Sequence, residues 1–315
     1  MTLKHLTTDE HRQVLERLVR LSARAQGALT HAAGLEYTSL MMCFLLHSKS
    51  VTDSLLALHR AFSGDWFPAT VGYVVVRSLF EVDVTAHYLA KAPVERSRRY
   101  INFGWVINKQ RLDAVNRHRN SSEPSWKEAM TAEYERYWLQ RATEVNAAFA
   151  KVSSTFKKKN GSIATSWSGK SLKEMATEVG HVEAYDVFYA YLSSFTHMNV
   201  KAANRFLRID PDGPTWTQRA TQFDVASIFQ HAAIFLTCFL ELFGEQFATW
   251  SPADVDGCWA FQRRTVAPAA RRSSWPPTWA TQAGPDQTSA RSPALAIKPT
   301  RGCTRFRSMS SRDIR

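Results

Sequence analysis

The chain has 315 residues, a length that suits one large domain or two small ones. Hydrophobic residues make up 44% of it and charged residues 22%, which excludes collagen-like repeats, a chain disordered throughout and a polytopic membrane protein. The formal net charge of +12 is unevenly distributed, because residues 251–315 hold 11 Lys and Arg against 4 Asp and Glu. Most of the charge therefore belongs to a tail and does not describe the folded body.

The cysteines and the apolar runs indicate the cellular compartment. The four cysteines are widely spaced and form no C-x-x-C pair, whereas a secreted disulfide framework would need a denser pattern. The first residues lead into a charged amphipathic stretch and show no apolar segment of a signal peptide. The longest apolar run, Ala232 to Leu240, is far shorter than the roughly 20 residues of a membrane-spanning helix. These features predict a soluble, cytoplasmic protein without a membrane partner.

Residues 1–250 show the spacing of apolar residues that is typical of helices. Capping boxes at Thr7–Glu10 and Ser171–Glu174 mark two helix starts, and Gly180 marks a helix end. The expected helices, in chain order, cover residues 7–29, 38–62, 68–91, 94–119, 124–157, 171–180, 183–197 and 221–250, with a turn at 210–214. The sequence therefore predicts an all-α bundle of about seven to eight helices, formed by a single domain over residues 1–250.

The remaining residues, 251–315, have a different composition. Only seven of them are Leu, Ile, Val or Phe, and they include ten arginines and seven of the twelve prolines. So few apolar side chains cannot offset the conformational entropy lost on folding, so we expect a disordered basic tail. A basic arm that touches nucleic acid and a run-on segment without a role are both compatible with this composition.

The expected helix over residues 69–90 is apolar on nearly every side, which is typical of a buried helix. Its full charges are Arg77, Glu81 and Asp83, and the first two are four residues apart and share a face with Tyr88. A buried charge is costly unless it is paired and hydrogen-bonded. We therefore expect an internal Arg77–Glu81 ion pair, which either holds the register of the helices or lines a polar site.

The expected helix over residues 183–197 provides polar side chains that could contact the Arg77–Glu81 pair. Asp186, Ser193 and His197 form a polar stripe along it, but a hydrolase triad is excluded by distance. Asp186 and His197 are eleven residues apart, about 16 Å along a helix, so the carboxylate cannot orient the imidazole. We expect instead that His197 and Ser193 face Arg77 and Glu81 across the core.

Two short motifs carry a family resemblance. Arg77-Ser78-x-x-Glu81 and Tyr191-Leu192-Ser193-x-x-x-His197 resemble motifs of an uncharacterised all-helical bacterial family, domain of unknown function 5677. The resemblance spans roughly residues 50–210. The family is loosely similar to the HEPN helical bundles, many of which act as ribonucleases in defence and toxin systems. The resemblance implies a helical fold and the location of a site at the two motifs. From the chemistry of the residues, the catalytic candidates are Arg77, Glu81 and His197, and the binding candidates are Ser193, Tyr88 and Tyr191.

Two functions remain open. The first is a binding or interaction module of unknown activity with a structural Arg–Glu–His cluster. The second is a metal-independent ribonuclease in which His197 is the base, Arg77 stabilises the phosphorane and Glu81 holds Arg77. The Arg–His spacing that marks HEPN ribonucleases occurs at Arg24…His31 and Arg111…His118, about as often as chance predicts.

No metal or cofactor is expected from the sequence. A di-iron bundle needs two Glu-x-x-His repeats, and the chain has one, Glu178…His181. Asp83 and His87 share a helix face, lack further ligands nearby in the sequence and are expected to form a surface pair.

The stretch 96–119 is basic and contains Tyr100, Phe103 and Trp105. This combination is compatible with a nucleic-acid surface, although a solvated helix face is the commoner explanation. RNA and a protein partner both remain open, as does a homo-oligomer.

Overall fold

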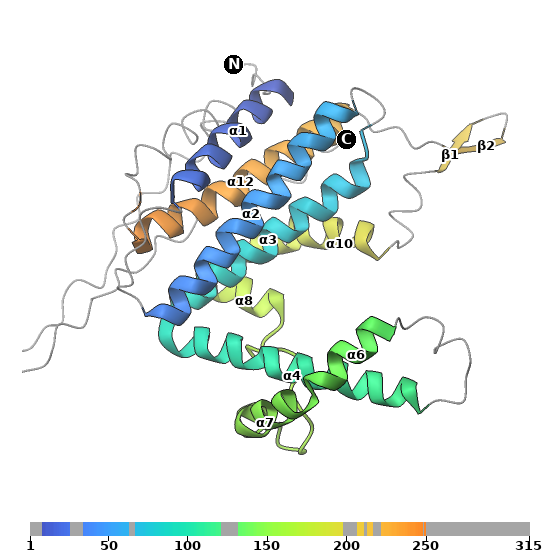
Figure 1. The fold of residues 1–315 in the computed structure, drawn as a ribbon. Coiled ribbons are helices and arrows are strands. Elements are labelled where there is room, and N and C mark those ends of the chain that lie inside the picture. The colour runs from blue at the N-terminus through green and yellow to red at the C-terminus, as the bar shows by residue number, and fades with distance from the viewer. Residues whose placement is uncertain are drawn as a thin grey trace, which may run out of the picture.

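The computed structural model describes residues 8–25, 34–62, 67–120, 132–197, 207–210, 213–216, 222–247 and 249. In these ranges the chain is helical apart from its loops and one short hairpin, which confirms the expected all-α bundle (Figure 1). The expected disordered tail, residues 251–315, and the first capping residue, Thr7, lie outside the described residues.

The helices and strands follow the expected order with some differences in their bounds. They are α1 (Thr8–Ala25), α2 (Leu35–Ala61), α3 (Ala69–Ala90), α4 (Pro93–Arg119), α6 (Ala132–Gln140), α7 (Ala142–Val152), the 3-10 helix η2 (Ser153–Phe156), α8 (Leu172–Val179), the single turn α9 (Val182–Ala184), the π-helix η3 (Tyr185–Tyr189), α10 (Ala190–Thr196), the strands β1 (Leu207–Asp210) and β2 (Gly213–Trp216), and α12 (Gln222–Phe247).

Three expected elements differ from the structure. Residues 124–131 of the helix expected over residues 124–157 lie outside the described residues, and the rest is divided into α6, α7 and η2, with a break at Arg141. The helix expected over residues 183–197 changes from α to π and back to α. Of the turn expected at residues 210–214, positions 211 and 212 lie outside the described residues, and the residues on either side belong to two strands that pair antiparallel, with Leu207 opposite Trp216.

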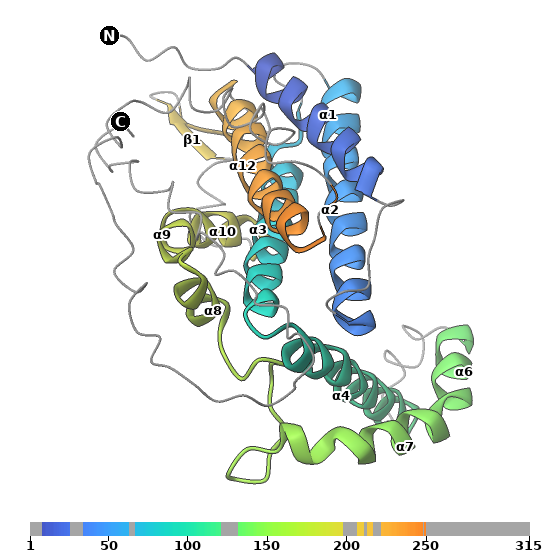
Figure 2. The same cartoon turned by 90° about the vertical axis from the view of Figure 1, so that its left-hand side faces the viewer.

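The core lies between α3 and the helices around it. Helix α12 packs along α3 and α1, α2 packs against α1 and α3, and α8 and α10 cover another side of α3 (Figures 1 and 2). Their buried apolar residues form one continuous cluster that runs from Val14 on α1 to Phe247 on α12. Because it is surrounded in this way, α3 can position side chains toward several partners at once.

Helix α12 has the length and composition of a membrane-spanning helix. Residues Asp224–Phe247 have the length and the mean hydropathy, 1.6, of a membrane span. In the structure 72% of this window is buried inside the bundle, as expected for the core helix of a packed domain. Length and composition alone therefore do not indicate a membrane segment here.

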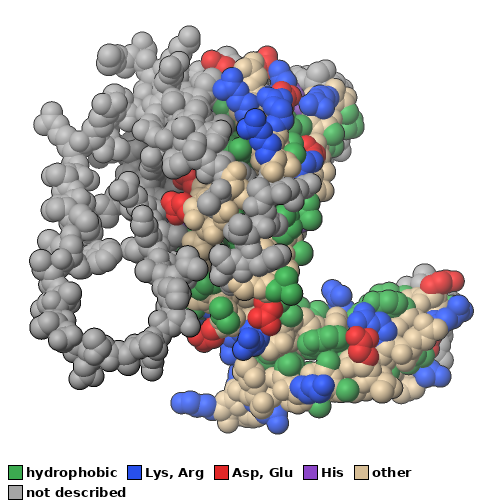
Figure 3. Space-filling view, turned by 60° about the vertical axis from the view of Figure 1, so that its left-hand side comes forward, with side chains coloured by type: hydrophobic (Ala, Val, Ile, Leu, Met, Phe, Trp, Pro, Cys, Tyr) green, Lys and Arg blue, Asp and Glu red, His purple; other side chains and the backbone are tan. Residues whose placement is uncertain are grey.

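Helices α4, α6 and α7 form an arm that projects from the bundle (Figures 2 and 3). Two small apolar clusters hold it together, one around Phe103 and Phe156 and one around Leu112 and Trp138. Phe103 is buried, and Tyr100 packs 5.0 Å from Trp167. Those two aromatic side chains of the stretch 96–119 therefore contribute to packing, which weakens the interpretation of this stretch as a nucleic-acid surface.

The expectation that α3 is buried on every side is wrong for one face. Val71 and Val74 are 45% and 40% exposed, whereas Tyr73, Val76 and Phe80 are buried. The exposed face lies one turn before Arg77, so Arg77 and Glu81 lie where the packing around the helix opens.

Candidate functional site

Arg77 on α3 joins three other side chains in one cluster. Its Nε donates to Glu81 Oε1 at 2.8 Å, and its Nη2 donates to the Tyr189 hydroxyl at 2.9 Å. Its Nη1 lies 3.4 Å from Nε2 of His197, and the Tyr189 hydroxyl donates to Glu81 Oε1 at 3.0 Å. The structure therefore brings together the three residues singled out in the sequence and adds Tyr189, which sequence reasoning missed.

The cluster lies at the surface and not inside the bundle, contrary to the expectation. The Arg77 side chain is 17% exposed, that of Glu81 is 42% exposed, and His197 is exposed. The expectation rested on the apolar surroundings of α3, but Arg77 and Glu81 follow the open face that carries Val74. A solvent-accessible cluster can meet a ligand, which a fully buried ion pair cannot do.

Local backbone structure places the partners of Arg77. Tyr189 is the last residue of the π-helix η3, and its ring stacks on Tyr185 at 4.9 Å. A π-helix has more residues per turn than an α-helix and is frequent at functional sites. An ordinary helical wheel does not represent this change, which is why the sequence did not single out Tyr189. His197 caps the end of α10, where its backbone N–H donates to the carbonyl of Ser193 at 3.1 Å.

The contacts shift the pKa values of two members of the cluster, Arg77 and Tyr189. Burial would lower the pKa of Arg77, but Glu81 and Tyr189 outweigh it and the pKa is raised. Burial and the Glu81 carboxylate raise the pKa of Tyr189 to about 12. Because a guanidinium can only donate, its contact with His197 requires a free lone pair on Nε2.

The three binding candidates occupy different places. Tyr191 is 40% exposed, and its ring meets Tyr73 edge-on at 5.4 Å. Ser193 is half-buried one turn before His197. Tyr88 is buried and does not join the cluster, because the Arg96 guanidinium covers its ring at 3.7 Å and Trp167 packs against its edge.

A second histidine lies on the other side of the same helix. His47 on α2 is hydrogen-bonded to the Ser78 hydroxyl at 2.8 Å, and Ser78 directly follows Arg77 on α3. Two imidazoles therefore contact neighbouring residues of α3, one from α2 and one from α10. The sequence carries no local signal for His47, because its partner lies 31 residues away.

A separate cluster is buried deeper along α3. Asp83, His87 and His181 are 1%, 6% and 2% exposed, and their ligand atoms lie within 4.8 Å of one another. The expected surface pair of Asp83 and His87 is therefore wrong, since both side chains are in the core. The statement that they lack further ligands is wrong as well, since His181 joins them from 94 residues along the chain.

The electrostatics of this second cluster keep the carboxylate ionised. Burial by itself would raise the pKa of Asp83, but His87 and His181 outweigh it and lower the pKa to about 2. Burial would lower the pKa of His87, and Asp83 raises it above its usual value. Nitrogen and oxygen donors of this kind could hold a metal ion.

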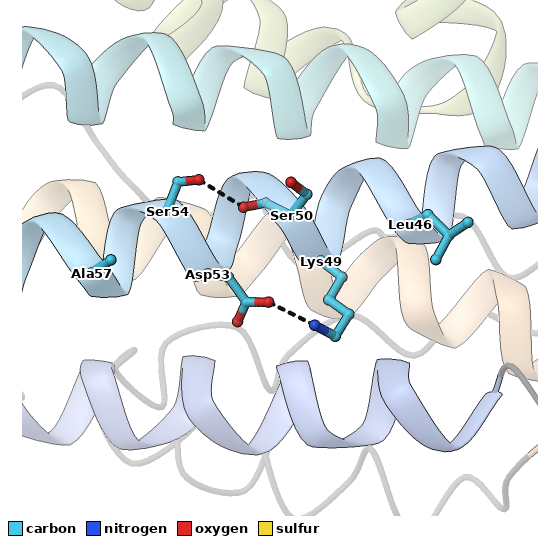
Figure 4. Close-up of a pocket in the computed structure, with 6 residues that line it drawn as sticks. All are labelled: Leu46, Lys49, Ser50, Asp53, Ser54 and Ala57. Carbon is cyan, nitrogen blue, oxygen red and sulfur yellow. Dashed lines mark hydrogen bonds and ion pairs between the residues drawn. The ribbon is translucent and has the colours of Figure 1, made fainter.

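A shallow pocket lies along α2 on the described surface. All six residues around it come from α2, and its charged members, Lys49 and Asp53, pair with each other at 2.6 Å (Figure 4). It contains none of the candidate residues, and its charges are already neutralised, so it is a weaker candidate than either cluster.

One family model matches the part of the chain that contains both clusters. No curated protein and no solved structure matches the chain significantly. The model of one family, described as a family of unknown function (DUF5677), matches residues 41–214, which include Arg77, Asp83, His181 and His197. Since this is more than half of the chain, the protein belongs to the DUF5677 family, whose biochemical activity is unknown.

Proposed function

We propose that the protein is a binding module that recognises single-stranded RNA through a phosphate group held by Arg77 and His197. The observation that carries the proposal is the 3.4 Å contact between Arg77 Nη1 and His197 Nε2 at a solvent-accessible surface. A solvent-accessible guanidinium is suited to a phosphodiester, because its N–H groups can donate to two of the phosphate oxygens at once.

The remaining donors of Arg77 support this assignment. An arginine has five N–H groups, and the contacts with Glu81, Tyr189 and His197 use one each. The other two are available to an anion, while Glu81 and Tyr189 hold the guanidinium in place. The long contact with His197 is the weakest of the three, so a phosphate could enter between the two side chains.

The surroundings suit an unpaired nucleotide. Tyr191 and Val74 are both 40% exposed and come from the two helices that supply His197 and Arg77. Exposed aromatic rings stack on bases without sequence preference, and stacking adds about 1–3 kcal/mol for each base.

A second candidate function, RNA cleavage at the same site, is favoured by the position of the His197 imidazole, a candidate base, beside the Arg77 guanidinium. In this reaction Nε2 takes the proton of the 2′-hydroxyl, and the 2′-oxygen forms a bond to phosphorus while the bond to the 5′-oxygen breaks. Arg77 stabilises the charge on the phosphorane oxygens. The leaving 5′-oxygen receives a proton from solvent, which gives a 2′,3′-cyclic phosphate and a 5′-hydroxyl.

Binding is tested with fluorescein-labelled single-stranded RNA and fluorescence anisotropy. Arg77→Gln should weaken binding by about tenfold, because it removes an arginine–phosphate contact. Arg98→Gln is the matched control, since Arg98 is 62% exposed on α4 and loses the same charge. If the wild-type chain does not bind RNA, or if both variants weaken binding equally, the proposal is wrong.

Cleavage is tested in the same samples by electrophoresis of end-labelled RNA. His197→Gln should abolish cleavage and leave a folded protein, as judged by circular dichroism. Binding without cleavage by the wild-type chain would support the binding module and reject the ribonuclease. Cleavage that persists in His197→Gln would place the activity elsewhere or in a contaminant.

We further propose that residues 1–250 act as one domain in the cytoplasm. The continuous core from α1 to α12 supports a single folding unit, and the burial of most of α12 supports a soluble bundle. Removing residues 251–315 should leave the free energy of unfolding within about 1 kcal/mol, measured by urea denaturation.

A further inference from the structure

Asp83, His87 and His181 converge at the junction of α3 with α8 and α9. Oδ1 of Asp83 lies 3.1 Å from Nδ1 of His87, and Oδ2 lies 3.2 Å from Nδ1 of His181. The two imidazole rings meet edge-on with their centroids 4.8 Å apart. We propose that these three side chains form a binding site for a divalent transition metal ion of the zinc type, which clamps α3 to the α8–α9 connection.

The backbone holds all three residues in place before any ion binds. Asp83 and His87 are one turn apart on α3 and therefore share a face. His181 follows Gly180, whose φ of 81° ends α8 in the left-handed conformation. The His181 N–H then bonds to the carbonyl of Ala176 at 2.7 Å, and its carbonyl accepts the N–H of Tyr185 at 3.0 Å. Such a preorganised turn leaves little entropy to lose on binding.

The separations fit the donor atoms of a small metal ion. Ligands at about 2.0–2.2 Å in tetrahedral geometry are separated from one another by roughly 3.3 Å. The two nitrogen–oxygen separations, 3.1 and 3.2 Å, are close to this value. All three ligand atoms lie within 4.8 Å of one another, so small side-chain rotations would complete the site.

The polar atoms of the cluster are incompletely satisfied without an ion. His87 Nδ1 is hydrogen-bonded to the backbone carbonyl of Asp83 at 2.9 Å, which leaves Asp83 Oδ1 without a hydrogen bond despite the short distance. Nε2 of His181 is also buried without a partner among the described residues. Buried polar atoms left in this state destabilise the folded protein. A cation bound to the carboxylate removes one such cost and displaces the proton of His87 Nδ1.

The donor set and the charge balance indicate the kind of metal. Two imidazoles and one carboxylate suit zinc and its neighbours, whereas magnesium and calcium prefer oxygen ligands alone. Glu245 on α12 exerts a negative potential on His87, so together with Asp83 it would balance the charge of a divalent ion. Three protein ligands leave a position for water or another group.

The site is distinct from the Arg77 cluster and does not depend on the RNA proposal. Arg77 and Glu81 are partly exposed, whereas Asp83, His87 and His181 are in the core. The burial of all three ligands favours a structural role, in which the ion joins segments that are 94 residues apart in the chain. The sequence did not reveal this site, because a lone Asp-x-x-x-His pair carries no indication of its third ligand.

The first test uses the full-length protein after treatment with a chelator. Addition of Zn²⁺ should give one bound ion per chain by calorimetry and raise the thermal midpoint by about 5 °C or more at saturating concentration. Mg²⁺ at the same concentration should have no such effect. His181→Gln should lose the zinc-dependent rise. His231→Gln, which alters another buried histidine outside the cluster, should keep it.

The second test needs no variant and covers the case in which His181→Gln fails to fold. X-ray absorption of the zinc-loaded wild-type chain should show nitrogen and oxygen ligands with the scattering pattern of two imidazoles. Absence of stoichiometric zinc binding, a zinc response that persists in His181→Gln, or sulfur in the first coordination shell would each overturn the proposal. Sulfur would indicate that cysteines elsewhere in the chain bind the ion.

Discussion

Nη1 of Arg77 on α3 lies 3.4 Å from Nε2 of His197 at the end of α10, although 120 residues separate the two in the chain. Glu81 and the Tyr189 hydroxyl complete the arrangement, so one guanidinium connects α3 with both η3 and α10. The cluster is therefore a tertiary contact as well as a candidate site. Its contribution to stability must be separated from its contribution to function.

Arg77→Ala should reduce the free energy of unfolding by about 1–3 kcal/mol, measured by urea denaturation. The cost is smaller than that of breaking a fully buried ion pair, because Glu81 stays accessible to water. Arg98→Ala removes an exposed pair with Glu36 at 3.7 Å and should change stability by less than about 0.5 kcal/mol. Equal effects of the two substitutions would show that Arg77 does not hold the helices together.

Residue spacing was sufficient to predict some of this architecture. The i,i+4 relation of Arg77 and Glu81 and the polar stripe ending at His197 correctly predicted that these side chains meet. The stripe could not reveal Tyr189, because the π-helix changes the register on which a helical wheel depends. It also could not reveal that the cluster is exposed, since exposure depends on which helices leave a face of α3 uncovered.

The buried cluster shows a different limit of sequence reasoning. Asp83 and His87 were recognised as neighbours on a helix, but their burial and their third partner depend on how α8 and α9 pack on α3. Ser171 and Gly180 correctly predicted the two ends of α8, and His181 follows directly. Local signals therefore placed each segment of the site, whereas its assembly depends on tertiary packing that no local pattern encodes.

Ser171→Ala should destabilise the protein by about 1 kcal/mol, because it removes the cap of α8. The Ser171 hydroxyl accepts the Glu174 N–H at 3.2 Å, and the Glu174 carboxylate accepts the Ser171 N–H at 2.6 Å. Ser54→Ala is the control, since the exposed Ser54 hydroxyl bonds only within α2 and alanine favours a helix. Urea denaturation of both variants checks the difference, and a loss of stability in Ser54→Ala alone would contradict it.

Gly72→Val should destabilise the protein by about 1–3 kcal/mol, because α3 and α12 approach closely at this glycine. A Cβ atom at Gly72 would lie 2.8 Å from the Cδ1 of Ile228 and 3.2 Å from the ring of Phe67. Both neighbours are buried in the core, at 0% and 1% exposed, so a larger side chain would have to displace packed atoms. Gly104→Ala on α4 meets no atom within 4 Å and should be neutral or stabilising by up to about 1 kcal/mol. Thermal unfolding of the two variants should therefore shift in opposite directions or differ clearly in size.

His231 on α12 should make the protein sensitive to mild acid. Burial lowers the pKa of its imidazole to about 4, although its hydrogen bond to the carbonyl of Ser227, at 2.7 Å, acts in the opposite direction. Nε2 is buried without a partner among the described residues, so the folded protein holds the ring in its neutral form. The unfolded chain takes up the proton near the ordinary value of about 6.5.

The direction in which the free energy of unfolding changes with pH follows from this difference between the folded and the unfolded pKa of His231. Above about pH 6.5 neither state binds the proton, and His231 imposes no penalty. As the pH falls from about 6.5 toward 4, the unfolded state is protonated first, so the free energy of unfolding decreases, by about 3 kcal/mol at the limit. His231→Gln cannot titrate and should lose about 2 kcal/mol less stability than the wild type between pH 7 and pH 4.5. Urea denaturation at the two pH values measures the difference, in which the groups common to both proteins cancel. Parallel losses in the two proteins would mean that His231 is protonated equally easily in the folded and unfolded states.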